Sequence, residues 1–169
     1  MNREIKYRGR DICTGEWVYG DLRQRVGCLP SIIHTFCNKG KLDYCETPIH
    51  RVSLGQSTGL YDINEKEIFE GDIVEWCFFY FETEILHKGV IEWHQGGFAF
   101  NVIDNYRHDV GWYGISDLNT DTESDVRVVG NIHDNLDLIS NYVPIEDQLK
   151  RLYSEIPEED RNTDAVLNL

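Results

Sequence analysis

Four side chains that could bind a metal ion fall within one segment of the chain. They are His34, Cys37, Cys45 and His50. Two residues separate the first pair and four separate the second, and structural zinc sites often contain ligand pairs at such short spacings. The alternative is a loop histidine beside buried, inert thiols. We predict no metal and no cofactor, and these four residues are the candidate ligands if zinc does bind.

A cluster of carboxylates could support acid–base catalysis. Asp117, Asp121, Glu123 and Asp125 fall in one predicted loop. In such a pair, one carboxyl group acts as the acid and the other as the base. This requires a site shielded from solvent, where the two groups have different pKa values. This loop is rich in serine, threonine and asparagine, which favours solvent around it. We interpret it as a solvated acidic loop.

A nucleophilic thiol is the third possibility. Cys77 could be activated by His87 or His94. It lies among aromatic residues in a predicted strand, however, where a buried thiol is the simpler interpretation. The chain contains no phosphate-binding loop of the G-x-x-x-x-G-K-[ST] type. We therefore predict that the protein is not an enzyme.

The elements that carry these residues are mostly strands. Alternation of apolar and polar residues predicts a β-hairpin over 2–22 and a three-stranded meander over 73–103. A last strand follows at 126–132. Proline cannot donate to a sheet ladder, so Pro48 predicts an edge strand. Apolar residues at helical spacing predict an amphipathic helix over 144–153.

The stretch from residue 55 to residue 76 links these elements through two turns. Gly55 and Gly59 suit a tight entry loop, because glycine adopts positive φ without a Cβ clash. Residues 62–66 are predicted to form a turn, because Asp62 and Asn64 can both hydrogen-bond nearby backbone groups. A second turn contains Gly71, which we expect to have positive φ or a close neighbour, and the next strand follows it.

Four separated blocks carry a family resemblance. They are residues 3–9, 15–20, 55–74 and 128–138, and together they resemble the YopX family of phage and prophage proteins. The residues that define the structural motif are Trp17, Gly55, Gly59, Gly71, Asp72, Gly130 and Asn131. The resemblance implies a mostly β fold, a meander sheet rolled toward a barrel, and no assigned activity. Glu65 departs from it, because the family usually has a turn glycine there.

From the pattern and the resemblance we predict a fold that is mainly β, a meander sheet rolled into a partial or closed barrel, with a C-terminal helix. The predicted division is a YopX-like β domain over residues 1–140, followed by a C-terminal helix and polar tail over residues 141–169. The chain has 169 residues, enough for a domain with its own core.

Charge and cysteine content restrict the partners and the compartment. The chain has 30 acidic residues against 16 Lys and Arg, a formal net charge of −14. This charge repels phosphate backbones and makes direct nucleic-acid binding unlikely. Five scattered cysteines argue against a disulfide framework, and no apolar run is long enough to cross a bilayer. We expect a cytoplasmic protein with free thiols and no membrane contact.

The predicted function is therefore that of a non-enzymatic phage or prophage accessory protein, which acts by binding another macromolecule. The partner is an unknown protein, and we expect a homo-oligomer in which the C-terminal helix and tail contact a neighbour. Two alternatives stay open: a nucleic-acid-associated protein, and a metal-dependent enzyme.

Overall fold

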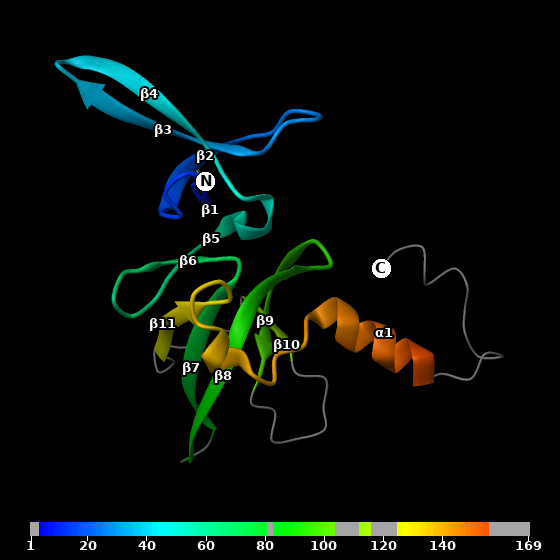
Figure 1. Ribbon diagram of the computed structural model, residues 1–169. Coiled ribbons are helices and arrows are strands. Elements are labelled where there is room, and N and C mark those ends of the chain that lie inside the picture. The colour runs from blue at the N-terminus through cyan, green and yellow to red at the C-terminus, as the bar shows by residue number, and fades with distance from the viewer. Residues whose placement is uncertain (1–3, 81–82, 104–111, 116–124, 156–169) are drawn as a thin grey trace. The chain divides into compact units, whose positions relative to one another are not determined.

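The computed structural model describes residues 4–80, 83–103, 112–115 and 125–155 (Figure 1). Its strands are β1 (Tyr7–Arg10), β2 (Trp17–Arg23), β3 (Ser31–Asn38), β4 (Lys41–Pro48), β5 (Gly55–Tyr61), β6 (Glu67–Phe69), β7 (Asp72–Tyr80), β8 (Thr83–His94), β9 (Gly97–Val102), β10 (Trp112–Gly114) and β11 (Asp125–Asn131). Its helices are the 3-10 turns η1 (Arg51–Ser53) and η3 (Leu136–Ile139) and the α-helix α1 (Ile145–Glu155).

The chain divides into two compact units, and the first spans Met1–Glu70. Its six described strands form one antiparallel sheet in the order β4-β3-β2-β1-β5-β6. Strand β4 is an edge strand of this sheet, as Pro48 predicted. Ile32, Ile49, Ile68 and Phe69 are its most deeply buried apolar side chains.

The second unit spans Gly71–Leu169 and contains a five-stranded antiparallel sheet in the order β10-β9-β8-β7-β11. Strands β7, β8 and β9 form the meander predicted over residues 73–103. One face of this sheet carries Ile73 and Val90, which pack with Ile139 and with partly buried residues of the segment after β11. The chain that follows the last strand therefore covers its own sheet.

The first five described strands of each unit have the same order, and β6 extends the first sheet by one further strand. In each, four consecutive strands form a meander, and the fifth strand returns to pair with the first: β5 with β1, and β11 with β7. The returning strand covers an edge that would otherwise expose unpaired backbone groups.

The prediction of a mainly β fold with a C-terminal helix is confirmed. The described strands form two open sheets, so the rolling toward a barrel is partial. The opening strand begins at Tyr7, later than predicted, because its pairing with β2 begins at Tyr7 and Gly20. The division at residue 140 remains a prediction. None of the described helices has the length and apolar character needed to span a membrane.

Candidate functional site

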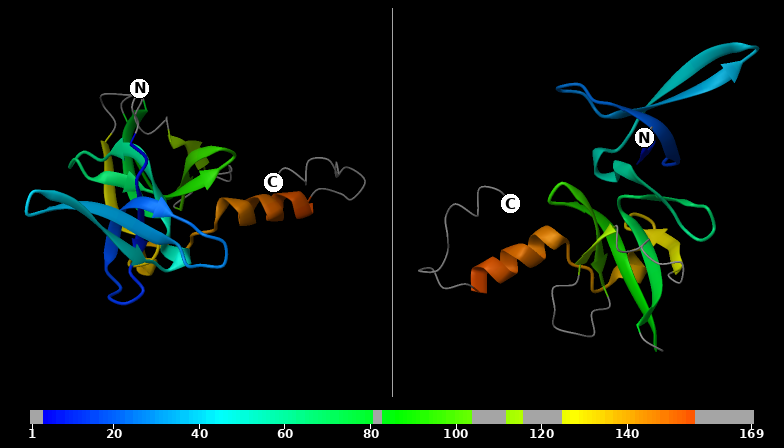
Figure 2. Two further views of the ribbon diagram at one scale, coloured as in Figure 1. Left: turned by 90° about the horizontal axis from the view of Figure 1, so that it is seen from above. Right: turned by 180° about the vertical axis from the view of Figure 1, so that it is seen from behind.

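The hairpin of β3 and β4, with the turn between them, is the most exposed element of the first unit. We call residues 31–48 the arm. In Figures 1 and 2 it extends away from the other strands of its unit. Every residue from position 35 to position 46 is exposed, although the two strands are fully paired. Phe36, Leu42 and Tyr44 are 43%, 82% and 63% exposed, so large apolar side chains meet solvent there.

The register of the arm separates the four candidate zinc ligands. His34 lies directly opposite Cys45, and paired residues of an antiparallel ladder share a face. Cys37 is opposite Leu42 on the other face of the hairpin. His50 follows the arm, and its backbone N–H donates to the Arg10 carbonyl. Within the described residues, no three His, Cys, Asp or Glu side chains gather closely enough to hold a metal ion.

The structure also does not bring Cys77 together with His87 or His94. Cys77 pairs with Leu86, whereas His87 pairs with Trp76, so Cys77 and His87 occupy opposite faces of the sheet. His94 lies at the far end of β8, opposite Gly97. Among the acidic-loop residues, Asp125 begins β11. The other three, Asp117, Asp121 and Glu123, lie outside the described residues.

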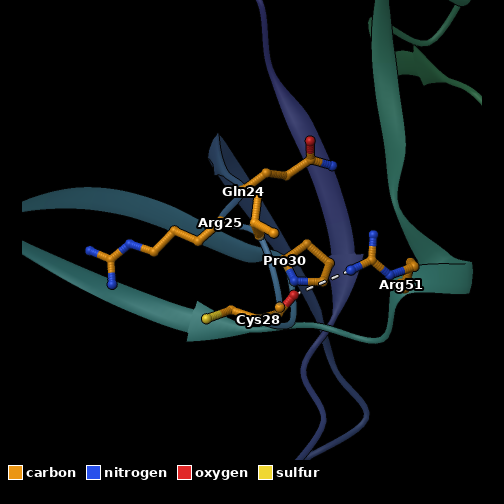
Figure 3. Close-up of a pocket in the computed structure, with 7 residues that line it drawn as sticks. Gln24, Arg25, Cys28, Pro30 and Arg51 are labelled. Atoms are coloured by element: carbon orange, nitrogen blue, oxygen red, sulfur yellow. Dashed lines mark hydrogen bonds between the residues drawn. The ribbon is translucent and has the colours of Figure 1, made fainter.

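A pocket lies between the loop that joins β2 to β3 and the 3-10 turn η1 (Figure 3). Its volume is about 300 Å³, and Gln24, Arg25 and Arg51 are its main polar lining residues. Arg51 donates to the Cys28 carbonyl at 3.2 Å. Figure 3 shows the Arg25 side chain pointing away from Arg51, so the two guanidinium groups do not converge on one anion.

A partly buried polar network attaches α1 to the second sheet. The Asn101 amide donates to the Glu92 carboxylate at 2.6 Å and to the Val143 carbonyl at 2.8 Å. Gln148 of α1 donates to the Asn101 amide oxygen at 2.9 Å. The other Glu92 oxygen accepts the backbone N–H of Ile145 at 3.0 Å. A strand carboxylate thus caps the first turn of the helix, where the dipole favours negative charge.

Sequence reasoning did not find this network. Asn101 alternates with Phe98, Phe100 and Val102, which places it on the opposite face of β9. An isolated asparagine on that face is typical of a solvent-facing position, yet Asn101 is fully buried. Its hydrogen bonds with Glu92, Val143 and Gln148 identify it as structural, and the last two residues are distant in the sequence.

The motif glycines of the central stretch have two different physical roles. Gly71 has φ of +81°, as predicted, and its N–H donates to the Ile91 carbonyl at 2.8 Å. Gly59 also has positive φ. Gly55 does not, and a Cβ there would lie 2.6 Å from the Glu70 carbonyl oxygen, so close packing requires that glycine. Asp72, at the start of β7, is buried.

The remaining motif residues also organise local structure. The guanidinium carbons of Arg8 and Arg10 lie 4.8 Å and 5.1 Å from the centre of a Trp17 ring, within the range of cation–π attraction. After β11, the Asn131 side chain accepts the backbone N–H groups of His133 and Asp134. A Cβ at Gly130 would lie 2.5 Å from the amide oxygen of Asn135.

These features define a mainly β protein with two antiparallel sheets, which share the order of five strands, and a projecting hairpin. The chain belongs to the YopX family, whose model, described as YopX protein, matches residues 6–140. Among solved structures, the crystal structure of protein EF1440 from Enterococcus faecalis is similar, with 22% identity and a TM-score of 0.48. That similarity covers 82% of this chain and 99% of the other. The search of curated proteins gave no match.

Proposed function

We propose that the protein is a non-enzymatic binding module that uses the arm to dock a protein partner, namely a second copy of the same chain. The observation that carries this proposal is the exposure of both faces of the paired hairpin from residue 35 to residue 46. A two-stranded hairpin without further support is marginally stable in water. Contact with another chain would bury Phe36 on one face of the arm, or Leu42 and Tyr44 on the other, and would stabilise the arm.

The distribution of charge favours a second copy of the chain as the partner that contacts the arm. In the arm, Lys39 and Lys41 balance Asp43 and Glu46, so its formal charge is zero, while the whole chain has −14. Two copies of such an acidic chain repel each other over most of their surface. The arm is a place where they can approach without that repulsion, and like surfaces that meet across a two-fold axis form a closed dimer.

Membership of the YopX family supports the wider part of the proposal, a role as an accessory protein of phages or prophages. The exposed thiols Cys13, Cys28, Cys37 and Cys45 support a reducing compartment such as the cytoplasm, where such groups stay reduced.

Light scattering of the purified chain, in EDTA and reductant at micromolar concentration, tests the docking. We expect twice the chain mass of 19.7 kDa. The triple variant Phe36→Ser, Leu42→Ser, Tyr44→Ser should be monomeric. Leu136→Ser, which changes an exposed apolar residue outside the arm, should remain dimeric.

A wild-type chain that is monomeric at micromolar concentrations would overturn the proposed apolar contact. So would a folded triple variant that keeps the dimer mass. Circular dichroism of each variant separates lost association from lost folding. Salt-dependent binding of DNA or RNA by the arm would support the nucleic-acid alternative in its place.

A further inference from the structure

We propose that His34 and Cys45 form half of a zinc site, which two arms complete by each contributing one imidazole and one thiolate. This inference rests on the proposed function, because it needs two arms to meet. It selects the face that carries Phe36, rather than the face of Leu42 and Tyr44, as the one on which the arms meet, and it assigns a ligand class to that face.

The register of β3 and β4 supplies the geometry. His34 and Cys45 are direct partners across the antiparallel pair. The Cβ atoms of such partners lie about 4.5–5.5 Å apart. Zinc ligands lie about 2.0–2.1 Å away for histidine nitrogen and about 2.3 Å away for thiolate sulfur, so one ion can bridge the pair. Cys45 is exposed and His34 is half-buried, so a metal can reach both.

One chain supplies only these two ligands. Asp43, on the same face, directs its carboxylate to the Tyr44 backbone N–H at 2.9 Å, and no third ligand joins the pair within the described residues. Structural zinc is nearly always four-coordinate and tetrahedral. A two-fold axis through the ion gives two histidines and two cysteines, which completes that geometry.

Zinc binding at this site releases protons from the two thiols. Each Cys45 thiol releases one proton to solvent and binds as thiolate, while His34 binds as neutral imidazole. One Zn²⁺ ion therefore displaces two protons from a pair of chains. The Cys45 sulfur also lies 3.8 Å from the Thr47 hydroxyl, a neighbour that can donate a hydrogen bond to a bound thiolate.

The test is titration of EDTA-treated, reduced protein with Zn²⁺, followed by light scattering and metal analysis, with Co²⁺ as a spectroscopic probe. We expect one metal ion for two chains and a dimer dissociation constant at least tenfold lower with zinc. Cobalt should give a thiolate charge-transfer band. Cys45→Ser and His34→Ala should lose these effects. Cys37→Ser, on the opposite face of the same hairpin, is the matched control and should keep them.

The outcomes separate this inference from the proposed function. Metal-free dimerisation through the arm that zinc does not strengthen would overturn the inference and leave the proposed function standing. A zinc-induced dimer lost in Cys45→Ser would support the inference even if the metal-free chain were monomeric. Binding of one ion per chain without a change in mass, or equal loss in Cys37→Ser, would overturn it.

Discussion

At the scale of single residues, the turn at residues 62–66 forms although Glu65 occupies a position where the backbone favours glycine. Glu65 has φ of +62°, in the left-handed region that favours glycine. The turn still forms because Asp62 holds it. Its carboxylate accepts the backbone N–H groups of Asn64 at 2.8 Å and Lys66 at 2.9 Å, and its backbone pairs with Lys66. The side-chain bonds of Asp62 therefore offset the strain at Glu65.

Replacing Glu65 by glycine should stabilise the protein. Relief of the left-handed strain outweighs the extra flexibility of glycine in the unfolded chain, so we expect a gain of about 0.5–1 kcal/mol. Urea unfolding of Glu65→Gly against wild type measures it. Glu67→Gly, two residues later in β6, is the control and should destabilise, since φ is not positive there. A Glu65→Gly variant less stable than wild type would contradict this account.

At the scale of elements, α1 is fixed to the second sheet chiefly through polar contacts at its start. Ile145 is buried, while Glu92 caps the first turn and Gln148 bonds Asn101. The predicted amphipathic helix is present, but its first turn contacts its own sheet. The sequence-based expectation that residues 144–153 contact a neighbouring copy therefore stays a prediction only for the part beyond this turn.

Tyr142 precedes α1 and makes this attachment sensitive to alkaline pH. Burial, and then the negative charge of Glu92 beside it, raise the pKa of Tyr142 well above its usual range. Because the folded chain holds this proton more tightly than the unfolded chain, the stabilisation is complete below the ordinary tyrosine pKa of about 10 and is lost as pH rises further.

We therefore expect wild type to lose more stability than Tyr142→Phe between pH 9 and pH 11. The difference should be below about 1.4 kcal/mol per pH unit, because partial exposure of Tyr142 weakens the effect. Urea unfolding at several pH values measures both slopes. Tyr44→Phe, which changes an exposed tyrosine, should follow wild type. Equal slopes for wild type and Tyr142→Phe would show that Tyr142 ionises freely in the folded chain.

At the scale of the whole molecule, the two units share the order of five strands but expose different surfaces. The first unit projects an exposed hairpin, whereas the second covers one sheet face with the segment after β11. The exposure of the five cysteines also differs between the two units. Cys13, Cys28, Cys37 and Cys45, all in the first unit, are exposed, and Cys77 of the second unit is half-buried.

Thiol titration should reflect that arrangement. Without reductant, native protein should show four fast-reacting thiols and a slower fifth from Cys77, because burial limits access to its sulfur. Denatured protein should show all five at one fast rate. Cys77→Ser should remove only the slow phase. If denatured, unreduced protein lacked two reactive thiols, a disulfide would be present and the expected cytoplasmic location would lose its support.

The sequence alone determined the strands, helix and turn that depend on residues close together in the chain. Period-two alternation determined β7, β8 and β9, helical spacing determined α1, and turn chemistry determined the conformation at Gly71. Only the tertiary structure decided which distant residues meet. Register brings His34 to Cys45 and separates Cys37, because a strand alternates faces at every residue. The burial of Asn101 depends on a helix that begins more than forty residues later, and no local pattern contains such a contact.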